Sequence, residues 1–108
     1  MLSNIKSQMR KGLLEYCILS VISRDEAYAS DILETLKDAQ LLVVEGTLYP
    51  LLTRMKNEGL LSYRWQESTG GPPRKYYALT PDGQLLLQQL NEEWHSICHS
   101  IEQVTHIH

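Results

Sequence analysis

The chain has 108 residues, of which 43% are hydrophobic, and its formal net charge at pH 7 is −3. This size corresponds to one globular domain, and the apolar content excludes an intrinsically disordered chain. Its two cysteines lie far apart in apolar segments, which excludes a disulfide framework and a zinc site and fits a reducing compartment. No signal-peptide pattern and no apolar run of about 18 residues is present, so the sequence predicts a cytoplasmic protein without membrane contact.

The charges are distributed unevenly along the chain. Residues 1–11 hold three basic and no acidic residues, and residues 47–77 hold five basic and two acidic ones. By contrast, residues 12–46 hold two basic and seven acidic residues, and residues 78–108 hold four acidic and no basic ones. Salt screens charges that lie more than about 10 Å apart, so phosphate contact requires a local positive face rather than a positive total. The two basic segments are therefore predicted to face phosphates.

Three helices are predicted in the first half of the chain. The first covers residues 3–23, and its second half is apolar nearly all round, which is typical of a helix at the centre of a core. The second covers roughly residues 28–39 and has an apolar stripe on one side. The third starts near residue 45 or 46 and ends at Gly59, which is placed to adopt a left-handed C-terminal cap.

The third helix has two dissimilar faces. Helical spacing places four apolar residues on the inner face: Leu48, Leu51, Leu52 and Met55. The outer face carries hydroxyl and guanidinium groups, those of Thr47, Tyr49, Thr53 and Arg54. A solvated helix face has a similar composition, but such groups also reach base edges when a helix lies in the major groove of DNA.

Two short strands follow the third helix. Residues 61–66 alternate between apolar and polar, which is strand periodicity, and residues 76–79 form the second strand. Residues 67–73 have turn composition, so the pair is predicted to form a hairpin with a flexible loop. Tyr76 and Tyr77 point to opposite faces, and one of them is expected in the core. Arg74 and Lys75 lie near the loop, where they would neutralise phosphates.

The last segment is predicted to be a helix for dimerisation. Thr80 provides a capping hydroxyl and Pro81 the first helical residue. From there six large apolar residues follow a heptad spacing that is typical of a helix paired with another helix: Leu87, Leu90, Trp94, Ile97, Ile101 and Val104. This stripe is short, so we expect the dimer interface to include Ile5 and Met9 of the first helix.

Together these elements predict a mainly helical fold with a small β-hairpin. Residues 1–79 are expected to form a winged helix-turn-helix domain that binds DNA, and residues 80–108 a C-terminal dimerisation helix. A dimer of this kind reads a pseudo-palindromic operator in double-stranded DNA. The expected DNA contacts are Lys6, Thr47, Tyr49, Thr53, Arg54, Arg74 and Lys75.

Three stretches of the sequence resemble the PadR family of transcriptional regulators. They are residues 45–61 at the third helix, residues 70–83 in the hairpin, and residues 9–15 near the N-terminus. The short length after Gly83 resembles the subgroup with a single C-terminal helix. Some members of that subgroup bind planar aromatic drugs between paired tryptophans at the dimer interface, and others respond to phenolic acids. The resemblance implies a repressor that such a compound releases from DNA.

Trp94 lies where the subgroup's tryptophan would be. One interpretation is an ordinary interface anchor, because tryptophan is enriched at interfaces. The other is effector binding, since pockets form between helices at such interfaces. If there is a pocket, Met9 and Tyr16 are predicted to form its walls.

Other functions receive less support from the sequence. Glu92, His95 and His99 have a helical spacing that could hold a metal, but they lie on the solvent side of the heptad, so no metal site and no cofactor is predicted. Phosphate loops and nucleophile motifs are absent, and residues 70–71 read as a turn, so we do not expect an enzyme. The alternative is a winged helix that serves only protein–protein interaction and has no small-molecule effector.

Overall fold

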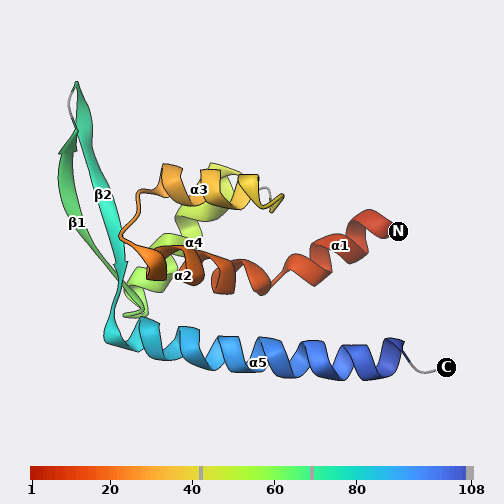
Figure 1. Ribbon diagram of the computed structural model, residues 1–108. Helices are drawn as coiled ribbons and strands as arrows, with labels where there is room; N and C mark the ends of the chain where they lie inside the picture. The colour runs from red at the N-terminus through yellow and green to blue at the C-terminus, as the bar shows by residue number, and fades with distance from the viewer. Residues whose placement is uncertain (42, 69, 107–108) are drawn as a thin grey trace.

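The computed structural model describes residues 1–41, 43–68 and 70–106. This part of the chain forms five helices and one two-stranded antiparallel sheet (Figure 1). In chain order the elements are α1 (Leu2–Arg10), α2 (Leu13–Arg24), α3 (Ala29–Asp38), α4 (Glu45–Asn57), β1 (Leu61–Ser68), β2 (Gly71–Leu79) and α5 (Pro81–Thr105). The predicted fold class, mainly helical with a small hairpin and a C-terminal helix, is confirmed.

The single helix expected over residues 3–23 is wrong, because the chain breaks into α1 and α2. Lys11 is extended, and Gly12 has φ of +89°, a conformation that glycine adopts without strain. α1 buries none of its residues, whereas α2 buries Ile18, Leu19 and Ile22. The break therefore lets α2 lie in the core while α1 leaves it.

The core lies between α2, α3 and α4. Its largest fully buried side chains come from these helices: Ile18, Leu19, Ile32, Leu48, Leu52 and Met55. Burying a side chain of this size contributes about 1.5–3 kcal/mol. α3 begins after Tyr28, whose backbone N–H donates to the Asp31 carboxylate at 3.0 Å. This contact satisfies a backbone donor at the start of α3.

α4 follows the predicted bounds closely. It runs through Pro50 to Asn57, and Gly59 adopts φ of +80°, as expected of a left-handed cap. The Leu60 backbone N–H then donates to the Met55 carbonyl at 2.9 Å, which closes the last turn and directs the chain into β1.

The hairpin is longer than the alternation predicts. Residues 67–73 were expected to form a loop, but β1 reaches Ser68 and β2 begins at Gly71. The register pairs Leu61 with Leu79 and Trp65 with Lys75, and it shifts between Gln66 and Ser68. A strand tolerates proline next to such an irregularity, because a residue there need not donate a backbone N–H to the partner strand. Pro72 and Pro73 therefore do not end β2.

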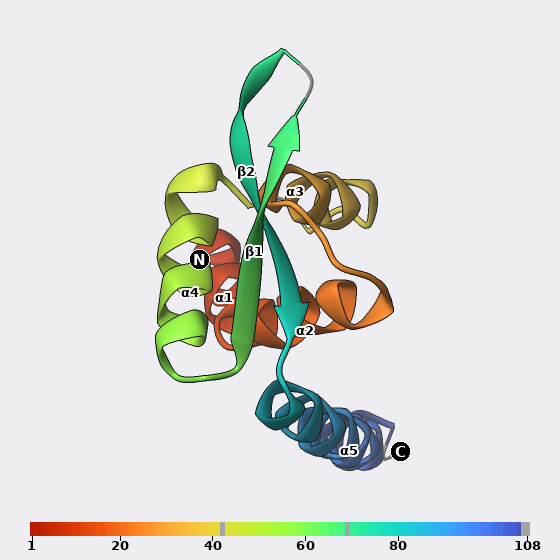
Figure 2. The same ribbon diagram turned by 90° about the vertical axis from the view of Figure 1, so that its left-hand side faces the viewer.

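The two faces of the hairpin have different neighbours. Figure 2 shows α4 on one side of the hairpin and α3 on the other, with α5 below. Tyr77 is buried and its backbone exchanges two hydrogen bonds with Ala27, at 2.9 and 3.0 Å. Tyr76 points to the other face, where its ring lies 4.5 Å from that of Tyr28. The expected division between a core tyrosine and an outer one is confirmed.

α5 begins at a close contact with the end of α4. Thr80 caps the helix by accepting the Gly83 N–H at 3.1 Å, as predicted, and its hydroxyl donates to the Gly59 carbonyl at 2.6 Å. Gly83 is buried against the Leu60 backbone. α5 packs its first half on the core through Leu86, Leu87 and Leu90, and its second half extends with α1 away from the hairpin (Figure 1).

These elements form a winged helix-turn-helix with an added C-terminal helix. α3 and α4 are the two helices of the helix-turn-helix, and the β1–β2 hairpin is the wing. No helix in the described residues has both the length and the apolar character needed to cross a membrane.

Candidate nucleic-acid interface

α4 exposes the face that the sequence assigns to base contact. Thr47, Tyr49, Thr53 and Arg54 are all exposed, whereas Leu48, Leu52 and Met55 on the inner face are fully buried. The inner residues therefore fix the rotation of the helix about its axis. This packing turns the polar face of α4 outward.

The exposed residues of α4 divide between two flanks. Tyr49 lies on the flank beside the hairpin, close enough to Tyr77 to contribute to the raised pKa of that phenol, and the Lys56 ammonium lies 5.7 Å from the centre of the Tyr63 ring. Thr47 and Arg54 lie on the other flank, which faces α2. One flank thus continues onto the wing, and the other leads away from it.

The wing carries cations on both of its faces. Lys75 lies over the rings of Tyr63 and Trp65, at 4.6 and 5.6 Å from their centres. On the opposite face the Arg74 guanidinium lies 5.5 Å from the centre of the Tyr28 ring, at the start of α3. Aromatic rings hold cations over their faces without neutralising them, so Lys75 and Arg74 keep their positive charge.

Arg54 and Arg64 are instead engaged by acidic side chains. Arg54 contacts the Glu15 carboxylate of α2, and its Nε lies 3.7 Å from the Glu58 carboxylate. Arg64 donates from Nε to Glu26 at 2.9 Å and lies over the Tyr76 ring. The sequence does not predict the pairs with Glu15 and Glu26, because the partners are 39 and 38 residues apart and no local pattern joins them.

Lys6 does not gather with the other predicted DNA contacts. It lies on the exposed helix α1, which extends away from the hairpin (Figure 1). Thr47, Tyr49, Thr53 and Arg54 share α4, and Arg74 and Lys75 share β2 of the hairpin. The structure therefore places four of the seven predicted residues on α4 and two on the hairpin, and it leaves Lys6 apart from both.

A groove of about 1060 Å³ lies between α1, α2, α4 and α5. We call it the α2–α4 groove, and the lining residues that matter below are Glu15, Tyr16, Thr47, Arg54 and Trp94. The Tyr16 hydroxyl donates to Asn91 of α5, and the ring centres of Tyr16 and Trp94 are 6.5 Å apart.

Of the three predicted effector contacts, two meet in this groove. Tyr16 and Trp94 line it, but Met9 is 69% exposed and does not line it in the single chain. Cys17 also lines the groove, and burial raises the pKa of its thiol. A raised pKa keeps the thiol protonated at neutral pH, so the side chain acts as an apolar part of the wall.

The predicted dimer residues fall into two groups. Leu87 and Leu90 are half-buried and pack on the chain's own core. The remaining members of the stripe are 36–73% exposed, namely Trp94, Ile97, Ile101 and Val104, and so are Ile5 and Met9 of α1. The exposed group forms apolar surface on the part of the molecule that lies away from the wing.

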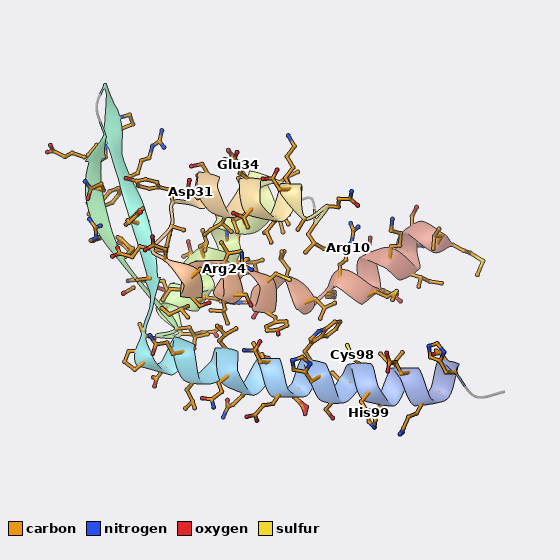
Figure 3. All side chains as sticks on the ribbon, viewed as in Figure 1. Arg10, Arg24, Asp31, Glu34, Cys98 and His99 are labelled. Carbon is orange, nitrogen blue, oxygen red and sulfur yellow. The ribbon has the colours of Figure 1, made fainter. Side chains whose placement is uncertain are left out.

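The histidines of α5 do not gather with other metal ligands. Within the described residues, no group of three or more histidine, cysteine or acidic side chains is placed to hold a metal ion. His99 points away from the rest of the molecule, whereas Cys98 lies on the side of α5 that faces α1 (Figure 3). His99 contacts Gln103 at 3.1 Å.

A helix with a bare polar face, flanked by a basic hairpin, defines a winged-helix protein of the kind that includes DNA-binding regulators. The chain belongs to the PadR-like family of transcriptional regulators, whose model matches residues 18–89.

Solved structures of related chains agree with this assignment. A PadR-like transcription factor from Bacteroides fragilis is 57% identical, with 94% of this chain and 98% of that chain covered and a TM-score of 0.80. A PadR family regulator from Eggerthella lenta is 31% identical, with 99% and 94% covered and a TM-score of 0.88. Bacillus subtilis PadR, solved in complex with operator DNA, is 26% identical, with 73% and 46% covered and a TM-score of 0.68.

Proposed function

We propose that the chain is a sequence-specific regulator that binds operator DNA as a homodimer. The observation that carries this proposal is the outer face of α4, where Tyr49 and Thr53 are exposed while Leu48, Leu52 and Met55 on the opposite face are fully buried. The major groove admits one helix, and hydroxyl groups on its outer face donate to and accept from base edges. Bacillus subtilis PadR, which this chain resembles, was solved in complex with operator DNA, and this supports DNA binding by the present chain.

The wing is proposed to bind the DNA backbone beside α4. Lys75 and Arg74 lie over aromatic rings and retain their charge, and Lys56 adds a third cation at the flank of α4 that faces the wing. Phosphate contacts from such cations fix the position of a protein on the duplex but carry no sequence information. In this proposal α4 supplies the specificity and the wing supplies affinity.

The exposed apolar side chains of α5 and α1 support a homodimer. Ile97, Ile101 and Val104 line one stripe of α5, and Ile5 is half-exposed on α1. Contiguous apolar surface of this kind marks an interaction site in a water-soluble protein. Two-fold pairing through it would place two copies of α4 on a pseudo-palindromic site, with residues 1–79 as the DNA-binding part and residues 80–108 as the dimerisation helix.

The α2–α4 groove supports a further proposal, that the protein is a ligand-responsive repressor. Its apolar wall and the Tyr16–Trp94 pair suit a planar aromatic drug or a phenolic compound, and its volume is that of a small-molecule site. Such a ligand would act as an inducer if it bound better to an arrangement of the two heads that does not fit the operator.

The DNA-binding proposal is tested with fragments selected from the host genome by the purified protein. Arg74→Ala is expected to weaken binding to every sequence alike and to lower the salt slope by about one, because one phosphate contact is lost. Thr53→Ala is expected to relax the preference at one base pair with little effect on the salt slope. Lys37→Ala, which removes an exposed cation from the last turn of α3, is the matched control.

The alternative is a winged helix that only binds another protein. It predicts weak binding with no selected sequence, and an affinity that Arg74→Ala lowers but Thr53→Ala leaves unchanged. The selection therefore separates the two functions, since a shared symmetric motif among the bound fragments is incompatible with the alternative.

The ligand proposal is tested by fluorescence, because the chain has two tryptophans. Trp65→Phe leaves Trp94 as the reporter in the groove, and Trp94→Phe leaves Trp65 as the reporter in the wing. Planar aromatic drugs and phenolic acids are titrated against both variants. Quenching in the first variant alone supports binding beside Trp94, whereas equal responses in both would remove Trp94 from the mechanism.

A further inference from the structure

Arg54 forms contacts that the DNA-binding face does not explain. Its guanidinium contacts the Glu15 carboxylate, and its Nε lies 3.7 Å from the Glu58 carboxylate. The Arg54 and Glu15 side chains are 49% and 38% exposed, so this pair lies at the surface, on the flank of α4 that lines the α2–α4 groove. A guanidinium between two carboxylates has little net charge left for a phosphate.

The two acidic partners of Arg54 differ in what they connect. Glu58 follows directly after α4 and is four residues from Arg54, so this pair lies within one helix and its cap. Glu15 lies in the first turn of α2, so its pair with Arg54 joins α4 to a different element. Of these two contacts, only the one to Glu15 bears on the direction of α4 relative to the rest of the domain.

The same turn of α2 also holds α5. Tyr16, the residue after Glu15, donates a hydrogen bond from its hydroxyl to Asn91, and its ring lies 6.5 Å from that of Trp94. Glu15 thus contacts α4, the helix proposed to enter DNA, and the next residue, Tyr16, contacts α5, the helix proposed to form the dimer. The first turn of α2 is therefore the point at which the orientations of α4 and α5 are tied together.

We propose that Glu15 is a positioning residue for DNA binding. Through Arg54, it fixes the angle of α4 relative to α2 and α5, and so the angle at which each copy of α4 enters its half-site. In this arrangement Arg54 helps to orient α4 and does not contact bases. The proposal rests on the operator binding proposed above, and it replaces the base contact that the sequence predicts for Arg54.

The test compares single, double and swapped variants of the full-length protein on its selected operator. Glu15→Gln and Arg54→Gln are each expected to weaken operator binding about two- to fivefold, the range that an exposed ion pair supports, with the salt slope unchanged. The double variant is expected to be no weaker than either single one, because both changes remove the same contact.

Glu58→Gln is the matched control. It removes an equal charge from the same guanidinium but leaves the link between α2 and α4 in place, so its operator affinity is expected to match or exceed that of the wild type. The swap E15R/R54E is expected to bind about two- to fivefold more tightly than R54E alone, because the link is restored with its charges reversed. The swap also carries the test if E15Q melts below the assay temperature.

Half-site spacing provides a readout that a loss of stability alone would not change. Wild-type protein should discriminate against an operator with one extra base pair between its half-sites, and E15Q should discriminate less, because its α4 helices are less firmly oriented.

Three results would overturn the proposal. A drop of about one in the salt slope for R54Q, together with tighter binding by E15Q, would make Arg54 a phosphate contact that Glu15 competes for. Equal affinities for E15Q and E58Q would show that the link to α2 has no effect. A wild-type protein that selects no operator would instead refute the proposed function, and this proposal with it.

Discussion

Replacing Gly83 by alanine is expected to destabilise the contact between α5 and the end of α4. A Cβ atom at this position would lie 2.1 Å from the Leu60 carbonyl oxygen and 3.1 Å from its carbon. Ordinary van der Waals contacts begin at about 3.4 Å, so the two backbones would have to separate by more than 1 Å. Backbone atoms cannot rotate away as a flexible side chain would, and the separation must therefore move α5.

The cost follows from the contacts at this position. Separation would strain the hydrogen bond from the Thr80 N–H to the Leu60 carbonyl, at 3.1 Å, and that from the Thr80 hydroxyl to Gly59, at 2.6 Å. Two such bonds are worth about 1 kcal/mol each, and overpacking adds about 1–3 kcal/mol. Alanine regains about 1 kcal/mol through its higher helix propensity. The net loss in the free energy of unfolding is about 2–4 kcal/mol.

Thermal and urea unfolding of Gly83→Ala and wild type, at equal protein concentration, measure this loss. For a domain of this size, about 2–4 kcal/mol lowers Tm by roughly 10–30 °C. Gly46→Ala is the control, because a Cβ there meets nothing within 4 Å and the residue lies in α4. It should leave Tm unchanged or raise it slightly. If Gly83→Ala melted within about 2 °C of wild type, the close approach would not be what requires glycine here.

Three further predictions follow from burial and exposure. Burial, and then the neighbouring Tyr49 and Tyr63, raise the pKa of Tyr77 above its ordinary value of 10.0. The contribution of Tyr77 to the free energy of unfolding is therefore fully present below about pH 10 and falls above it, because the phenol ionises first in the unfolded chain. In melting curves across this range Tyr77→Phe should lose less stability than wild type, and equal losses would contradict the assignment. Ile101→Asp should give monomers in sedimentation at concentrations where wild type is a dimer, with unchanged helix content, whereas Gln103→Asp on the same helix should remain dimeric; a dimeric Ile101→Asp would place the interface elsewhere. Burial raises the pKa of Cys17, so iodoacetamide at pH 8 should modify it more slowly in the native protein than in urea, and equal rates would show that the groove wall opens freely.

The sequence predicts α4 and α5 well because both are defined by local rules. The spacing of Leu48, Leu52 and Met55 sets the buried face of α4, and Gly59 adopts the left-handed cap expected of it. Thr80 and the proline after it mark the start of α5, and Gly83 completes the cap. Each of these signals lies within one turn of the residue whose position it determines.

The features that the sequence does not predict depend on contacts across the fold. The apolar periodicity continues through Gly12, so the break between α1 and α2 is visible only once α2 is packed in the core. The ion pair of Arg54 with Glu15 joins residues that are 39 positions apart. It depends on the angle between α2 and α4, which no spacing along the chain encodes. Arg54 is exposed, as the sequence predicts, but its charge is paired with that of Glu15.

The residues predicted for the groove illustrate the same limit. Tyr16 and Met9 were predicted to be the walls of a pocket beside Trp94, and the rings of Tyr16 and Trp94 do lie 6.5 Å apart. The sequence predicts one helix over residues 3–23 that holds both Met9 and Tyr16, but the chain breaks between them. The left-handed Gly12 turns α1 aside, and Met9 points to solvent in the single chain.

The turn at Gly12 separates α1, which we call the N-terminal arm, from the core, so the arm needs other contacts to stay helical. α1 has nine residues and buries none of them, and an isolated helix of that length is marginal in water because nucleation is costly. In the proposed dimer, the surface that covers Leu2 and Ile5 would then supply the free energy that keeps the arm helical. Folding of the arm and association of the subunits become a single equilibrium, and the helix content seen by circular dichroism should rise with protein concentration.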